Sequence, residues 1–167
     1  ATFKQSQRTE LAVNENTATP VDRISMPKGF EVELIYSVPA AERGSWVNLC
    51  IDDKGRIIAS DQFGGLYQFE PPSPGAVLQP TDIKRIPVDI RAANGLLWAF
   101  DALYVAVNDY EQKIDSGLYR VTDSNSDGEL DNVEKLRTMY SQDDHGVHAL
   151  LLSPDRKAIY MITGNRT

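Results

Sequence analysis

Short apolar runs separated by Gly, Pro, Asp and Asn follow one another from Met26 to the end of the chain. Such runs indicate strands, and the separating residues mark turns. Residues 30–36 alternate apolar Phe30, Val32, Leu34 and Tyr36 with other residues, which predicts a strand there. No stretch shows the apolar period of a helix of ten residues. We therefore predict an all-β protein.

The predicted strands recur as repeated hairpins. Gly117-Leu118-Tyr119-Arg120-Val121 repeats Gly65-Leu66-Tyr67-Gln68-Phe69, and the return strands align at Ile57, Leu103 and Ile159, roughly 50 residues apart. Repeats of this length, with about four short strands each, are typical of β-propeller blades. The predicted strands are residues 46–51, 56–61, 65–69, 96–100, 103–107, 117–121, 148–152 and 158–162. Turns are expected at 52–55, 101–102 and 153–156, and a Pro-rich stretch, 71–74, closes the first unit.

The chain divides into an arm and a set of blades. Residues 1–25 are polar and read as an extended N-terminal arm, whereas residues 26–167 supply about two and a half blades. A propeller usually needs at least four blades to close, so we expect an N-terminal piece of a longer protein, incomplete at its C-terminus. A complete sandwich of this length is the alternative.

Charge and composition exclude some partners. The net charge is −7 and no Lys/Arg cluster offsets it, which argues against nucleic acid and anionic membranes as partners. No apolar run approaches the roughly 20 residues of a membrane span. The single cysteine, Cys50, lies in an apolar run and is expected to fill the core. A chain that starts at Ala1 fits a processed periplasmic or secreted protein, and equally an arbitrary boundary.

Residues 123–134 match the twelve-residue calcium loop of EF-hands. Gly128 stands at position 6, where the loop turns sharply. No entering helix precedes the loop. Downstream, Leu130, Val133, Leu136 and Tyr140 could lie on a short helix, or residues 136–140 could form a strand. The calcium would be structural and would stabilise the conformation of a long blade loop. The alternative is a solvated acidic turn without metal. The predicted ligands are Asp123, Asn125, Asp127, Glu129 through its carbonyl, Asp131 and Glu134.

Both histidines of the chain, His145 and His148, lie just after Asp143 and Asp144. Three interpretations stay open: structural histidines, a metal pair whose spacing matches no specific zinc signature, or a catalytic base. In the third, His145 is a general base that the Asp144 carboxylate orients, while His148 begins a strand.

Asp144-His145 is followed by Pro154-Asp155 and then by a strand that ends in Gly164-Asn165. This order resembles the glucose/sorbosone dehydrogenase family, which carries an Asp-His pair, a Gly-Pro-Asp turn and a strand ending in Gly-Asp. The resemblance implies a six-bladed propeller that uses pyrroloquinoline quinone, with His145 as the base that takes the sugar hydroxyl proton. Four further stretches are similar to the "membrane-bound dehydrogenase" propellers of planctomycetes and verrucomicrobia, which often continue into a c-type cytochrome segment. They are residues 26–34, 44–47, 59–67 and 145–149.

The chain also departs from the first family. Ala93 stands where a glutamine is expected before Asn94-Gly95-Leu96-Leu97, Ser153 replaces the turn glycine, and Asn165 replaces the terminal acid. The residues that would bind the quinone are unknown, and the chain has no CxxCH for covalent haem.

Together these features predict the N-terminal part of a periplasmic or secreted quinoprotein-type dehydrogenase acting on a small carbohydrate or alcohol. Its partners would be the remaining blades and a c-type cytochrome that receives electrons. The alternatives are a propeller that serves as a binding or scaffold module, and a calcium-dependent lactonase-like hydrolase.

Overall fold

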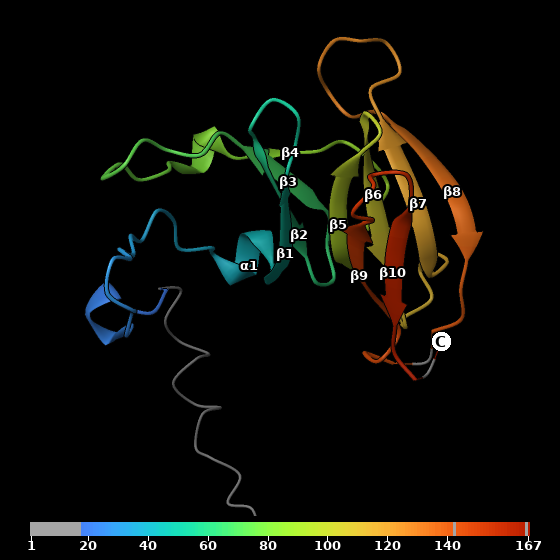
Figure 1. Ribbon diagram of the computed structural model, residues 1–167, viewed down its shortest axis with the longest axis horizontal. Coiled ribbons are helices and arrows are strands. Elements are labelled where there is room, and N and C mark those ends of the chain that lie inside the picture. The colour runs from blue at the N-terminus through green and yellow to red at the C-terminus, as the bar shows by residue number, and fades with distance from the viewer. Residues whose placement is uncertain (1–17, 142, 166) are drawn as a thin grey trace, which may run out of the picture.

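The computed structural model describes residues 18–141, 143–165 and 167. Its strands form three antiparallel sheets, none of them closed, so the all-β prediction is confirmed (Figure 1). One four-stranded sheet has the order β1-β2-β3-β4, another has the order β5-β6-β7-β8, and β9 pairs with β10. The strands are β1 (Trp46–Ile51), β2 (Ile57–Asp61), β3 (Leu66–Phe69), β4 (Lys84–Arg85), β5 (Ala93–Ala99), β6 (Ala102–Val107), β7 (Gly117–Thr122), β8 (Asn132–Thr138), β9 (Val147–Leu152) and β10 (Ile159–Thr163).

Helical structure in the described residues is limited to single turns. They are the 3-10 turns η1 (Val21–Arg23) and η2 (Pro80–Asp82) and the short helix α1 (Ala40–Arg43). None of the helices in the described residues is long and apolar enough to cross a membrane. Of the predicted N-terminal arm, residues 1–17 lie outside the described residues, and the remainder contains η1.

The return strands occupy equivalent places in their sheets. β2, β6 and β10 are each the second strand and pair antiparallel with the strand before them. The spacing of Ile57, Leu103 and Ile159 therefore marked a real structural repeat. The open alternative for residues 136–140 is also settled, because most of that stretch belongs to strand β8.

The strand predicted at residues 30–36 is wrong. The segment forms no ladder, and Phe30 is 70% exposed. The Ile35 carbonyl accepts from the amide of Leu78, in the connection between β3 and β4, at 2.8 Å. Alternation is necessary for a half-buried strand, but a strand also needs a partner for its backbone groups.

Two boundaries also differ from the prediction. The β5–β6 hairpin turns at Phe100 and Asp101, one residue earlier than expected, and both have positive φ angles of 50° and 54°. Positive φ at both central positions defines the type I′ turn that joins twisted strands in two residues. The first sheet does not end at the Pro-rich stretch, because β4 adds to β3 beyond it.

The sheets contact one another through their first strands. β5 lies against both β1 and β9 (Figure 1). The Asn48 side chain of β1 accepts from the Leu96 amide at 3.2 Å and donates to the Asn94 carbonyl at 3.4 Å, so it bridges β1 to β5. On the other side of β5, a Cβ at Gly95 would lie 1.9 Å from the His148 carbonyl oxygen of β9. This close approach requires glycine.

The core fills the space between the sheets, and the two outer faces of the stack remain apolar and exposed. Ile58, Leu66, Leu103 and Val105 are fully buried in one cluster. On the face of β1 that points away from β5, Val47, Leu49 and Ile51 are exposed, as are Leu151, Tyr160 and Ile162 of β9 and β10. Exposed apolar faces of this kind mark contact surfaces.

Candidate functional site

His145 and Asp144 lie on the loop that leads into β9. Their side chains are 64% and 75% exposed, and Nε2 of His145 lies 3.8 Å from Oδ1 of Asp144. The His145 amide donates to Oδ1 of Asp143 at 2.8 Å, which shapes the loop. The structure therefore brings the predicted base and its carboxylate together, at the distance of a loose ion pair.

His148 belongs to a strand, whereas His145 belongs to the loop before that strand. His148 lies on β9 and is half-buried, one residue after the fully buried Val147. Among the described residues, no group of three or more His, Cys, Asp or Glu side chains is arranged to hold a metal ion. His148 is thus a strand residue, as the third interpretation of the histidines expects.

Ser153 lies in the turn after β9, where its hydroxyl is hydrogen-bonded on both sides. Ser153 is buried, and its hydroxyl donates to Oδ1 of Asp155 at 2.6 Å and accepts from the Ala158 amide at 2.9 Å. The Ser153 hydroxyl, together with the Lys157 amide, holds the pKa of Asp155 below its ordinary value. Ser153 therefore stabilises the β9–β10 turn.

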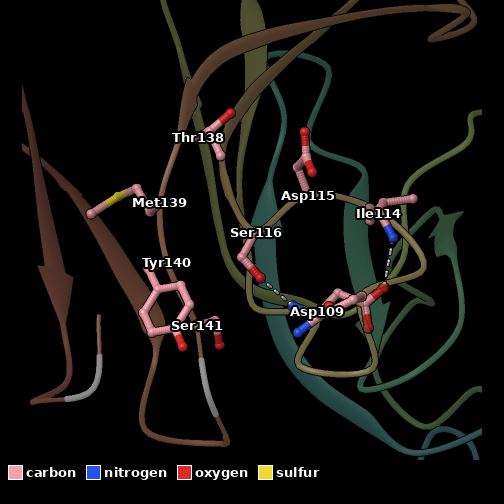
Figure 2. A pocket seen from close by; sticks show the side chains of 9 residues that line it. Asp109, Ile114, Asp115, Ser116, Thr138, Met139, Tyr140 and Ser141 are labelled. Carbon is pink, nitrogen blue, oxygen red and sulfur yellow. Dashed lines mark hydrogen bonds between the residues drawn. The ribbon is translucent and has the colours of Figure 1, made fainter.

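A cavity of about 460 Å³ opens between the β6–β7 loop and the segment after β8 (Figure 2). Its lining mixes carboxylates, hydroxyls and apolar groups, but it includes neither His145 nor Asp144. Asp109 is buried, and its carboxylate accepts from the Glu111, Lys113 and Ile114 amides. The lining residues are Asp109, Gln112, Ile114, Asp115, Ser116, Thr138, Met139, Tyr140 and Ser141.

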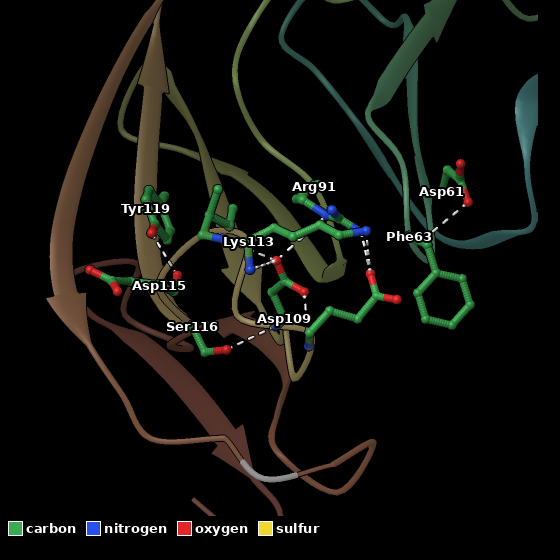
Figure 3. A network of polar contacts seen from close by, with 10 residues as sticks. Asp61, Phe63, Arg91, Asp109, Lys113, Asp115, Ser116 and Tyr119 are labelled. Carbon is green, nitrogen blue, oxygen red and sulfur yellow. Dashed lines mark hydrogen bonds and ion pairs between the residues drawn. The ribbon is translucent and has the colours of Figure 1, made fainter.

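The cationic side chains near this cavity are held by carboxylates of the same chain (Figure 3). Arg91 lies 3.5 Å from Asp109 and 2.8 Å from Glu111, which also pairs with Lys113 at 2.9 Å. Hydrogen bonding to Lys113 is the main cause that lowers the pKa of Glu111. Lys135 pairs with Asp115 in the same way. These cations are already neutralised within the chain.

The first half of the predicted calcium loop is organised around Asp123. Its carboxylate accepts from the Asp127 amide at 3.2 Å and from the Gly128 amide at 2.7 Å. Desolvation opposes ionisation of Asp123, but the amides of residues 125–128 outweigh it and lower its pKa. Asn125 and Asp127 join the same turn through the Asn125 side chain, whose Nδ2 donates to Oδ2 of Asp127 at 2.9 Å.

Asp131 and Glu134, in the second half of the loop, contact other residues than Asp123, Asn125 and Asp127. Asp131 accepts from the amide and the hydroxyl of Ser124, both at 2.8 Å. Glu134 lies within β8, opposite Arg120 of β7, and their charged groups are 3.6 Å apart. The structure thus gathers Asp123, Asn125 and Asp127 but does not gather Glu134 with them.

Two cations from the β1–β2 hairpin reach the same loop. Arg56 donates to the Gly128 carbonyl at 3.3 Å, and Nζ of Lys54 lies 3.0 Å from where a Cβ at Gly128 would stand. The position of Arg56 is fixed by the buried Asp52, which accepts from its Nε at 2.7 Å. The acidic loop is therefore tied to the first sheet.

Cys50 is expected to resist alkylation in the native protein. Burial, followed by the charge of Asp52, raises the pKa of its thiol to about 12. At pH 8 the thiolate fraction is then about 10⁻⁴, against roughly a quarter for an unfolded cysteine with a pKa near 8.5. Iodoacetamide labelling, followed by mass spectrometry, should be about a thousandfold slower in buffer than in guanidinium chloride. Rapid native labelling would contradict the raised pKa of this half-buried thiol.

Searches against protein-family models and against curated proteins found no match to this chain.

Proposed function

We propose that this chain forms the N-terminal blades of a six-bladed β-propeller of the quinoprotein-dehydrogenase type. Two four-stranded antiparallel sheets and a third sheet of two strands, with their first strands side by side, support the proposal. The exposed apolar faces at both ends of the stack are the surfaces that neighbouring blades would cover. The proposal places the protein in the periplasm or outside the cell, with a c-type cytochrome as electron acceptor.

The chemistry assigned to this chain is proton removal from a substrate hydroxyl. The observation that carries it is the exposed Asp144–His145 pair on the loop entering β9, where a substrate can reach the imidazole. Because Nε2 faces Asp144, Nδ1 of neutral His145 would accept the hydroxyl proton. The Asp144 carboxylate then stabilises the imidazolium that forms. A small carbohydrate or alcohol is the proposed substrate.

The quinone itself is not accounted for by the described residues. A bound pyrroloquinoline quinone would supply a hydride acceptor, and its carboxylates would require cationic partners. Arg91, Lys113 and Lys135 are each neutralised by carboxylates of this chain. The three cations near the cavity therefore do not fit the group, and the proposal needs other cations to hold the quinone.

One observation favours a non-catalytic binding or scaffold propeller as the second candidate. The side chains of His145 and Asp144 are exposed, and the cavity beside the β6–β7 loop does not include them. Catalytic groups usually lie in concave sites from which water is partly excluded.

Turnover by the full-length protein separates the two candidates. The assay would supply pyrroloquinoline quinone, glucose and related sugars or alcohols, and an artificial electron acceptor. Oxidation that depends on the quinone supports the dehydrogenase proposal. No turnover with any of these substrates would leave the scaffold candidate ahead.

Calcium at residues 123–134 is the structural part of the proposal, supported by the gathered oxygens of Asp123, Asn125 and Asp127. At calcium 100 times above its dissociation constant we expect a rise in Tm of about 5–10 °C, measured by calorimetry. Asp127→Ala should abolish the rise, whereas Asp53→Ala, on the adjacent β1–β2 turn, should keep it. An unchanged Tm at millimolar calcium would exclude the site.

A further inference from the structure

The loop that carries His145 is attached to the end of β6 by one buried side chain, Asn108. Asn108 directly follows β6 and is 2% exposed. Its Nδ2 donates to the Asp143 carbonyl at 3.0 Å, and its Oδ1 accepts from the Ser141 hydroxyl. The Ser141 hydroxyl also lies 3.2 Å from the Asp143 carbonyl. Both polar atoms of the Asn108 side-chain amide therefore form hydrogen bonds with the segment that leads to His145.

Two glycines allow the loop to pack this closely. A Cβ at Gly146 would lie 1.8 Å from Oδ1 of Asn108, so the residue after His145 cannot carry a side chain there. On the β10 side, the Gly164 amide donates to the Gly146 carbonyl at 2.7 Å. A Cβ at Gly164 would lie 1.9 Å from the His145 carbonyl oxygen. The His145 backbone is thus held between Asn108 and Gly164.

The first sheet contains a similar contact, but within one sheet: Asp61 of β2 holds the loop into β1 of the same sheet, whereas Asn108 of β6 holds the loop into β9 of another sheet. Asp61 ends the return strand β2, is buried, and accepts from the Ser45 amide at 3.1 Å just before β1. A Cβ at Gly44 would lie 2.0 Å from Oδ2 of Asp61. A buried polar side chain at the end of a return strand therefore fixes the loop into a first strand in both places.

We infer that Asn108 is a positioning residue, which sets the place of His145 for proton removal without touching the substrate. The catalytic part of this inference rests on the proposed function. Loss of the amide would free the backbone of residues 143–146 while leaving the imidazole and Asp144 in the chain. Displacement of a base by about 1 Å can cost on the order of 100-fold in rate.

The test compares Asn108→Ala with Val107→Ala in the full-length protein. Val107 is fully buried at the end of β6 and packs in the core cluster with Leu103 and Val105, so its truncation destabilises the sheet while leaving the Asn108 amide in place. Asn108→Ala should lower kcat about 100-fold with KM within about twofold, because the loss falls on the transition state. Hydrogen–deuterium exchange of the peptide spanning residues 143–150 should accelerate at least tenfold. Val107→Ala should change neither kcat nor this exchange.

Asn108→Asp refines the comparison. It keeps the acceptor for Ser141 but loses the donor to the Asp143 carbonyl, and should give an intermediate kcat and exchange rate. Faster exchange together with the lower kcat supports the inference. Exchange that stays unchanged in Asn108→Ala, or a kcat that stays unchanged while the wild type turns over, would overturn it. If the wild type oxidises nothing, the proposed function fails, and the exchange result alone decides whether Asn108 positions the loop.

Discussion

His145→Ala is expected to lower kcat for the proposed oxidation of sugars or alcohols by about 10²–10⁴-fold in the full-length protein. The imidazole is the proposed acceptor of the hydroxyl proton, and alanine leaves water to take it. KM should change little, because proton transfer develops in the transition state and not in the ground-state complex. Steady-state kinetics with the quinone and an artificial acceptor measure both constants.

Two matched variants make the His145 experiment specific. His148→Ala removes the other histidine from β9, outside the proposed chemistry, and should keep kcat within about threefold. Asp144→Asn keeps the shape of the carboxylate but removes the charge that would stabilise the imidazolium, and should lower kcat by only about tenfold, since the two side chains are 3.8 Å apart and exposed. Equal rates in wild type and His145→Ala would exclude His145 as the base.

The sequence predicted β1–β3, β5–β7, β9 and β10 near their observed places, because each carries a clear apolar run next to turn residues. It did not predict β4, which is two exposed residues long, and it gave β8 only as one alternative, at residues 136–140. The exception at residues 30–36 has the right pattern and lacks a paired neighbour in the described part of the chain. Whether a strand forms there depends on residues far away in the sequence, and the local alternation carries no information about them.

Site prediction from the sequence was limited by long-range contacts in the same way. The spacing of residues 123–134 identified an ordered acidic turn, but β8 begins inside the motif and places Glu134 opposite Arg120. Asn108 was recognisable only as a polar residue at a strand end, because its partner Asp143 lies 35 positions further along. Ser141 gave no sequence signal for its part in the Asn108 contact.

Gly95→Ala should destabilise the fold by about 3 kcal/mol or more, measured by urea denaturation. The added methyl would stand 1.9 Å from the His148 carbonyl oxygen, and that oxygen belongs to the backbone of β9, which cannot move aside alone. Relief of the clash would require the third sheet to move away from β5. The same shift would carry the loop of His145 with it, so the proposed activity should fall as well.

Gly65→Ala is the matched control for the Gly95 variant. A Cβ at Gly65 would approach Nε of Arg85 at 3.1 Å, and a long flexible side chain can withdraw at little cost. We expect a loss under about 1 kcal/mol for this variant. The difference in the loss of unfolding free energy between the two variants then measures how strongly the packing of β9 against β5 resists displacement. A loss at Gly95 no larger than at Gly65 would mean that the third sheet does not pack on the second as the structure shows.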